Sequence, residues 1–78
     1  MMSNTLKIGD RVWWRGGFGT DKVRMATVAG IEITRGGKYG EAVDEVPWSE
    51  VYDRNVTVDV DTDDGYHWAY AEQIKRIR

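Results

Sequence analysis

The chain contains no cysteine, so neither a disulfide nor a zinc site with thiolate ligands can stabilise its fold. It also lacks any apolar run close to the roughly 20 residues that a membrane-spanning helix needs. Residues 1–7 are largely polar and show no signal-peptide pattern, and these absences together predict a cytoplasmic protein. The 78 residues suit one small domain, residues 1–78, whose stability must come from a hydrophobic core.

An excess of basic residues is also missing, since the formal net charge is −2. Residues 1–40 hold seven Lys/Arg against three Asp/Glu, residues 41–64 hold one Arg against nine acids, and residues 65–78 hold three basic residues against one acid. Nucleic-acid-binding domains are usually basic, because phosphate neutralisation drives their affinity. The acidic balance therefore disfavours general nucleic-acid binding. A local basic face stays open as an alternative to pairing between the oppositely charged segments.

Residues that carry catalysis or bind metals are scarce. His67 is the only histidine, and Asp59 is expected across a hairpin from it, an arrangement more typical of a cross-strand contact than of a catalytic dyad. Asp59–Gly65 resembles the start of a calcium loop, but Asp64 occupies the sixth position, where Gly is needed, and Tyr70 occupies the twelfth, where Glu is needed. We therefore expect no catalytic residue, no metal site and no cofactor, and predict that the protein is not an enzyme.

What the chain does have is β-strand patterning, which begins after Gly9–Asp10. In Arg11–Trp14, Val12 and Trp14 alternate with Arg11 and Trp13. Val12 and Trp14 are therefore expected to face a core while their neighbours face solvent. The glycine-rich segment Gly16–Asp21 then predicts a loop, because clustered glycines do not hold a regular element.

A long second strand is predicted from Val23 to Thr34, where most residues are β-branched or small. The apolar residues of this strand do not keep the two-residue spacing of a regular strand, since Val28 and Ile31 are three residues apart. A β-bulge at Ala29–Gly30 would bring both side chains into the core and bend the strand sharply. Small barrels need such a bend in order to close.

The second half of the chain predicts a hairpin. Arg35–Lys38 is the expected turn after the second strand. The next segment shows no clear period of apolar residues, and the strand Val56–Val60, in which apolar and polar residues alternate, follows it. Asp61–Gly65 is the expected hairpin turn, and Tyr66–Ala71 is the returning strand.

Three further segments lie outside the strands and the hairpin described so far. Residues 1–6 are expected to be a disordered tail, and residues 39–52 are expected to be an insertion that contains a helical turn at Pro47–Tyr52. Residues 72–78 predict one tight turn followed by a short strand, because a helix of this length is marginal. The alternative is a C-terminal helix with one apolar face, made of Tyr70, Ile74 and Ile77.

The order of these elements resembles a Src-homology-3-like small β-barrel of the Tudor and KOW kind. Gly9-Asp10-x-Val12 is similar to the opening of KOW modules, Ala26–Glu32 to the bulged second strand of Tudor domains, and Trp68–Ile74 to a last hairpin strand that runs into a short turn. The resemblance implies an all-β, bent barrel of five or six strands with a short helical turn near the C-terminus. The chain is also similar to short uncharacterised proteins of bacteria and phages, a similarity that implies no known activity.

Aromatic residues, 12% of the chain, provide the positive signal for function. If Trp14 points inward, Trp13 points outward between two arginines, and Tyr66 and Trp68 share one face of the returning strand. Exposed aromatics of this kind anchor protein contacts or stack on bases, although Trp13 could instead cover the core or pack under the insertion. The candidate partner-binding residues are Arg11, Trp13, Arg15, Phe18, Tyr66 and Trp68.

The sequence thus favours a non-catalytic module for protein–protein recognition, self-association included, and no membrane partner is expected. The first alternative is nucleic-acid binding by a basic-aromatic face made of Arg11, Trp13, Arg15, Lys22 and Arg24, together with Lys75 and Arg76. The less favoured alternative is a hydrolase that uses His67 and Asp59.

Overall fold

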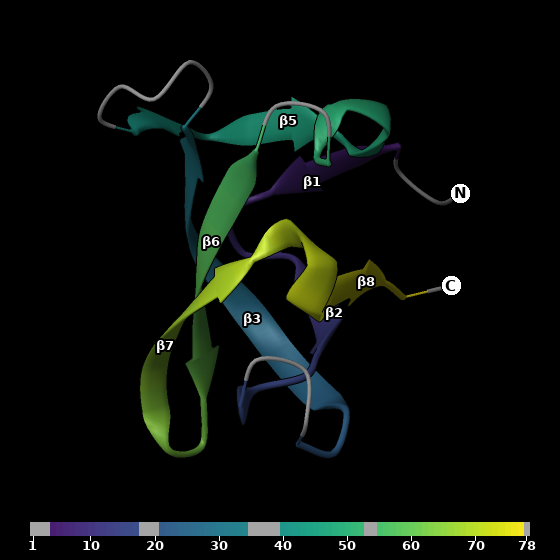
Figure 1. Cartoon of the computed structure of the whole chain (residues 1–78), viewed down its shortest axis with the longest axis vertical. Helices are drawn as coiled ribbons and strands as arrows, with labels where there is room; N and C mark the ends of the chain where they lie inside the picture. The colour runs from purple at the N-terminus through teal and green to yellow at the C-terminus, as the bar shows by residue number, and fades with distance from the viewer. Residues whose placement is uncertain (1–3, 18–20, 35–39, 53–54, 78) are drawn as a thin grey trace.

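The computed structural model describes residues 4–17, 21–34, 40–52 and 55–77, which form a small all-β protein of antiparallel sheets (Figure 1). The strands are β1 (Thr5–Lys7), β2 (Arg11–Trp14), β3 (Arg24–Ile33), β4 (Glu41–Val43), β5 (Glu45–Pro47), β6 (Val56–Thr62), β7 (Gly65–Tyr70) and β8 (Ile74–Arg76). Two short 3₁₀ helices, η3 (Trp48–Glu50) and η4 (Ala71–Gln73), lie before β6 and β8.

The strands form two sheets. The larger sheet has the order β7-β6-β3-β2-β8, with β4 also paired to β3, and the smaller sheet joins β1 to β5. In Figure 1 the small sheet lies at one end of the molecule, and the long strand β3 crosses the middle of the larger sheet. The start of β1 and the end of β8 lie on the same side of the molecule in this view.

β3 carries the predicted bulge. Val28 pairs with Val60, but the next partners are Gly30 and Asp59, so Ala29 is an extra residue in the ladder. Val28 and Ile31 are consequently both buried, at 0% and 2% exposure. The bulge prediction is therefore confirmed. The bulge allows this long strand to place side chains in the core both before and after the irregularity.

The core follows the alternation of the strands. In β2 the odd–even pattern buries Val12 and Trp14 and exposes Trp13, as the sequence predicts. Trp14, the largest core side chain, has its ring centroid 4.8 Å from that of His67, and the guanidinium of Arg24 lies 4.9 Å from it. The buried apolar residues are Leu6, Val12, Trp14, Ala26, Val28, Ile31, Ile33, Val46, Val51, Val56, Val58, Val60, Ala69, Ala71 and Ile74.

The N-terminal segment differs from its prediction. Thr5 and Leu6, which the sequence places in a disordered tail, belong to β1 and pair with β5. Leu6 is fully buried, opposite Val46. The reason is tertiary: burial of a leucine side chain stabilises the strand by about 1.5–3 kcal/mol, and its partner strand comes from a part of the chain that local patterning does not connect with it.

The helical turn predicted at Pro47–Tyr52 is η3, which begins directly after Pro47. The described part of the 39–52 insertion does more than lengthen a loop, because β4 pairs with β3, and Val46 and Val51 join the core. At the other end, η4 followed by β8 confirms a turn plus strand. The alternative C-terminal helix is wrong.

Candidate functional site

Three aromatic side chains stand in a row on the outer face of β7. Because His67 and Ala69 alternate with them and face the other way, Tyr66, Trp68 and Tyr70 all point to solvent, at 73%, 52% and 44% exposure. The rings of Trp68 and Tyr70 contact each other edge to face, with centroids 4.5 Å apart. The predicted shared face of this strand is therefore confirmed.

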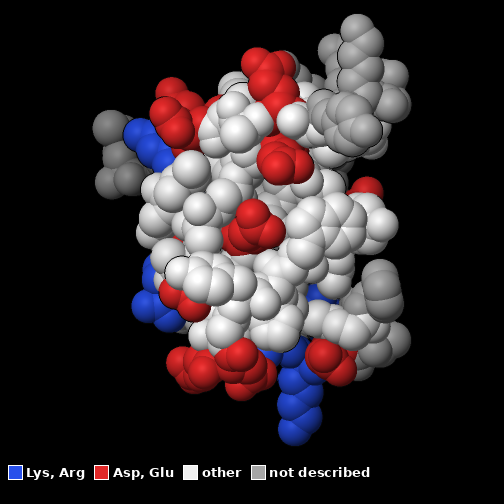
Figure 2. All heavy atoms as spheres, turned by 90° about the vertical axis from the view of Figure 1, so that its left-hand side faces the viewer, with Lys and Arg blue, Asp and Glu red and all other residues white. Residues whose placement is uncertain are grey.

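Carboxylates accompany this row. In the β6–β7 ladder Asp59 lies opposite Trp68 and Asp61 lies opposite Tyr66, and all four residues are exposed. Glu32 of β3 is exposed on the same face, one strand further on. Figure 2, which views the side of the molecule where β7 lies, shows acidic side chains at the centre and along the upper and lower borders. We call Glu32, Asp59, Asp61, Tyr66, Trp68 and Tyr70 the acidic-aromatic face.

A small hollow lies within the acidic-aromatic face. It measures about 150 Å³ and is lined by Gly30, Glu32, Thr57, Val58, Asp59 and Trp68. The absence of a side chain at Gly30 keeps it open, because a Cβ there would stand 3.0 Å from Oδ2 of Asp59. Carboxylates on one wall and an indole on another suit a cationic group.

A second aromatic surface surrounds Trp13, on β2. This side chain is 38% exposed, with exposed Arg11 and Arg15 on either side along the strand. Lys75 of β8 lies opposite Trp13 in the ladder, and both residues line a hollow of about 320 Å³. The backbone N–H of Arg15 donates to the carbonyl of Gln73 at 2.9 Å, and the Gln73 amide donates to the Arg15 carbonyl at 3.0 Å, so one wall of the hollow is held in place.

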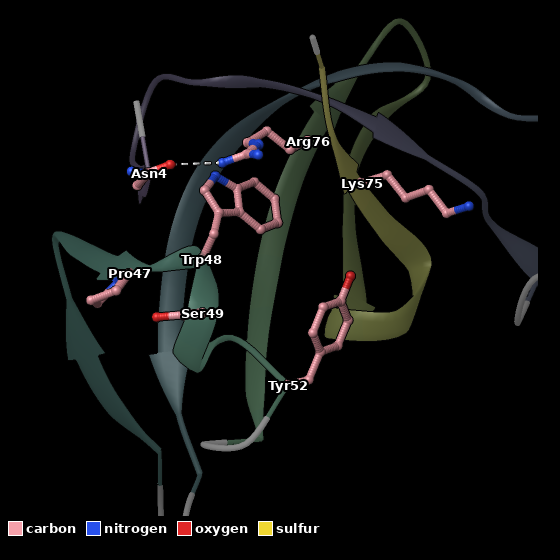
Figure 3. A pocket seen from close by; sticks show the side chains of 7 residues that line it. All are labelled: Asn4, Pro47, Trp48, Ser49, Tyr52, Lys75 and Arg76. Carbon is pink, nitrogen blue, oxygen red and sulfur yellow. Dashed lines mark hydrogen bonds between the residues drawn. The ribbon is translucent and has the colours of Figure 1, made fainter. Parts of the chain in front are cut away.

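A third hollow, of about 620 Å³, lies between η3 and β8 (Figure 3). Its lining residues are Asn4, Pro47, Trp48, Ser49, Tyr52, Lys75 and Arg76. Trp48 and Tyr52 are not among the sequence-predicted site residues. The sequence signal that could have identified them is a pair of aromatic residues four positions apart around a helical turn that starts after proline. The residues of β8 that line the same hollow are known only from the tertiary structure.

The sequence-predicted partner-binding residues form two surfaces instead of one. Arg11 and Trp13 lie on β2 and Arg15 directly follows it, whereas Tyr66 and Trp68 lie on β7, and β3 and β6 lie between β2 and β7. Phe18 lies outside the described residues.

The predicted basic-aromatic face is also smaller than expected. Arg24 pairs with Trp14, not Trp13, and its guanidinium lies over the Trp14 ring and contacts Oδ2 of Asp64 at 2.9 Å. Lys22 is exposed in the segment before β3. Arg24 is excluded from the Trp13 surface because paired residues of adjacent strands share one face of the sheet.

The pairing of His67 with Asp59 is wrong. Val60 lies opposite His67, and Asp59 lies opposite Trp68, so the alternation of side chains puts Asp59 and His67 on opposite faces of the hairpin. His67 is half-buried against the ring of Trp14, and its Nε2 is buried without a hydrogen-bond partner within the described part of the chain. The register therefore removes the proposed base and acid from each other's reach.

Among the described residues, no group of three or more His, Asp or Glu side chains is placed to hold a metal ion. No described helix has the length and apolar character to cross a membrane. Comparisons with protein-family models, with curated proteins and with solved structures found no match to the chain.

Proposed function

We propose that this protein is a non-catalytic recognition module that binds another protein through its acidic-aromatic face. The observation that carries the proposal is the row of three exposed rings on β7. Large apolar side chains gathered on a surface favour a partner that covers them, and tyrosine and tryptophan are enriched among the residues that dominate binding energy.

The charges around the rings support a basic partner. Asp59, Asp61 and Glu32 lie along one side of the aromatic row, and lysine or arginine side chains interact favourably both with such carboxylates and with the face of an indole ring. β7 is also the last strand in the order of the larger sheet, so no described strand pairs with its outer edge. An extended basic segment that pairs along this edge would place alternate side chains over the rings.

We further propose a Src-homology-3-like barrel as the framework. Support comes from the order β7-β6-β3-β2-β8, from the bulged long strand β3, and from η4 immediately before the last strand. These are the features that the resemblance in sequence leads one to expect. In such a framework two outer surfaces, on β2 and on β7, remain available for binding.

The test is capture of partners by immobilised wild-type protein and by a double variant, Tyr66→Ala with Trp68→Ala. We expect a partner that the wild type binds directly, once purified, and that the double variant loses. Arg11→Ala is the matched control, because Arg11 is exposed on a different strand. Equal binding by the double variant and the wild type would refute the proposal.

Nucleic-acid binding by Arg11, Trp13 and Arg15 is the second candidate function. It is favoured by one observation, the position of Lys75 directly opposite the exposed Trp13, which adds a cation to the aromatic ring and the two arginines. Titration with single-stranded and duplex oligonucleotides at increasing salt tests it, since phosphate contacts make affinity fall steeply with salt. Absence of binding at low ionic strength ends this candidate.

A further inference from the structure

We infer that the acidic-aromatic face binds the surface around Trp13 on a second copy of this chain, so that two copies associate through unlike surfaces. The second surface, here called the Trp13 surface, consists of Arg11, Trp13, Arg15, Val23, Met25 and Lys75. The assignment rests on the proposed function, because it names the partner of the same row of rings on β7.

The Trp13 surface has an exposed apolar centre. In the β2–β3 ladder Met25 lies opposite Trp13, and the two side chains are 42% and 38% exposed. Val23 is exposed as well and lines the hollow of about 320 Å³ beside Trp13. Apolar side chains that gather on a surface in this way favour a partner that covers them.

Cations border this apolar centre. Arg11 and Arg15 precede and follow Trp13 at a spacing of two residues, and both are exposed. Lys75 is exposed opposite Trp13 in the β2–β8 ladder. Within the described ranges, none of these three cations takes part in an ion pair. Glu72 also lines the hollow, but the three cations exceed this single carboxylate, so the Trp13 surface is positive.

The acidic-aromatic face has a similar composition with the opposite charge. Its rings are exposed, and its charged side chains are the carboxylates of Glu32, Asp59 and Asp61. In the part of the chain that the structure describes, these carboxylates form no ion pair. Lysine and arginine interact favourably with carboxylates and with ring faces, so each of the two surfaces supplies the charge that the other lacks.

Both surfaces lie on the same outer face of the larger sheet. Thr27 of β3 pairs with Arg11 of β2 on one side and with Asp61 of β6 on the other. Because paired residues of adjacent strands point to the same face, Arg11 and Asp61 share that face, with backbones roughly 10 Å apart. A two-fold axis between two copies can therefore place the Trp13 surface of each copy on the acidic-aromatic face of the other, and the contact then forms twice.

The charge of the whole chain favours a second copy as the partner. The formal net charge is only −2, so two copies repel each other weakly, while their unlike surfaces attract. Each surface consists of about six side chains, which is small for a stable complex. We therefore expect a dissociation constant between about 10 µM and about 1 mM.

The first experiment is sedimentation velocity of the purified chain over this concentration range, at low and at high salt. We expect the mass to rise with concentration towards that of a dimer, and the association to weaken several-fold at high salt, because salt screens exposed charges. A monomer at every concentration overturns the inference and leaves the proposed function to its own capture test. If that monomer binds an oligonucleotide at Trp13, the occupant of the Trp13 surface is nucleic acid instead of a second copy.

The second experiment reverses the charge of each surface. The basic-reversed variant carries Arg11→Glu and Lys75→Glu, and the acid-reversed variant carries Asp59→Lys and Asp61→Lys. Each variant alone is expected to associate at least about tenfold more weakly than the wild type, because its contact brings like charges together. An equal mixture of the two variants is expected to regain association, since both contacts of a mixed dimer then join opposite charges.

The matched control for the acid-reversed variant carries Asp44→Lys and Glu45→Lys, an equal change of charge at exposed residues at the smaller sheet. It is expected to keep the association. Circular dichroism checks the fold of each variant, and the single changes Lys75→Glu and Asp59→Lys replace any double variant that does not fold. The inference is overturned if the mixture associates no better than its components, or if the control loses association as strongly as the acid-reversed variant.

Discussion

Asp59 and Trp68 face each other across the β6–β7 ladder on the outer surface of the sheet. The carboxylate and the indole line the same hollow, and the neighbouring Gly30 leaves that hollow open. This relationship makes β7 more than an apolar strip, because Trp68 and Tyr66 each lie opposite a carboxylate, that of Asp59 and that of Asp61. A basic partner satisfies both the ring and the carboxylate in one contact.

Filling or neutralising this hollow is expected to weaken binding of a basic partner. Gly30→Ala puts a methyl group 3.0 Å from the Asp59 carboxylate, and Asp59→Asn removes the charge. Each change is expected to reduce affinity for a Lys/Arg-rich peptide several-fold, as measured by fluorescence anisotropy at low salt. Asp63→Asn, in the exposed hairpin turn, is the control with the same loss of charge. If it weakens the peptide equally, the effect is general charge and not the hollow.

The exposed rings of β7 are expected to contribute little to stability. Tyr66 is 73% exposed, so Tyr66→Ala should change the free energy of unfolding by no more than about 0.5 kcal/mol. Urea denaturation followed by circular dichroism measures this. A loss of several kcal/mol would show that the ring serves the fold and would remove it from the binding surface.

Trp14 is expected to behave in the opposite way. Only 4% of this side chain is exposed, and Trp14→Ala should cost about 3–5 kcal/mol of unfolding free energy because it leaves a large cavity. Small domains have about 5–15 kcal/mol in total, so this variant should be largely unfolded at moderate temperature. Trp13→Ala, on the neighbouring and partly exposed position, is the matched control and should remain folded. Similar losses from both variants would contradict the alternation of β2.

Gly16 is expected to be intolerant of any side chain. A Cβ at this position would stand 2.9 Å from Cζ2 and Cη2 of the buried Trp14 ring. Because the ring is held by the core, Gly16→Ala should destabilise the protein by about 1–3 kcal/mol, the cost typical of overpacking. Thermal unfolding compared with Arg15→Ala, a change at the exposed neighbouring residue, tests this. An unchanged midpoint for Gly16→Ala would mean that the indole can move aside.

The ion pair between Arg24 and Asp64 is expected to be worth little, and the stacking of Arg24 on Trp14 to be worth more. Both side chains are substantially exposed, at 42% and 61%, so Asp64→Asn should cost at most about 1 kcal/mol, and less at high salt. Arg24→Ala should cost more than Asp64→Asn, since it also uncovers the Trp14 ring. Denaturation of both single variants and the double variant separates the two contributions. Equal costs for the single variants would exclude a role for the stacking.

Much of the local structure was predictable because it depends on neighbours in the chain. The three-residue spacing of Val28 and Ile31 is compatible with a shared core only through a bulge, and the bulge is present. The alternation in β2 likewise assigned Trp13 to solvent and Trp14 to the core. η3 follows the proline that predicts a helical turn, and η4 overlaps the segment in which the sequence predicts a tight turn.

The parts that were not predictable depend on contacts between distant segments. β1 is a strand because Leu6 pairs with Val46, which is forty residues away in the chain. No local sequence pattern predicts this pairing. The hairpin register is a second case: a shift of one residue decides whether Asp59 faces His67 or Trp68, and the turn geometry makes it Trp68. The hollow between η3 and β8 is a third case, since Tyr52 and Arg76 line it together only when β8 pairs with β2.

The amino-acid order alone therefore determined which side chains face inward along each strand, because a pleated backbone alternates its side chains over a distance of only a few residues. The folded chain decided which strands are neighbours, and with that which rings lie beside which charges. The physical reason is that strand pairing and burial of apolar area act between segments regardless of their separation in sequence, so the acidic-aromatic face and the hollow between η3 and β8 exist only after the sheets have assembled.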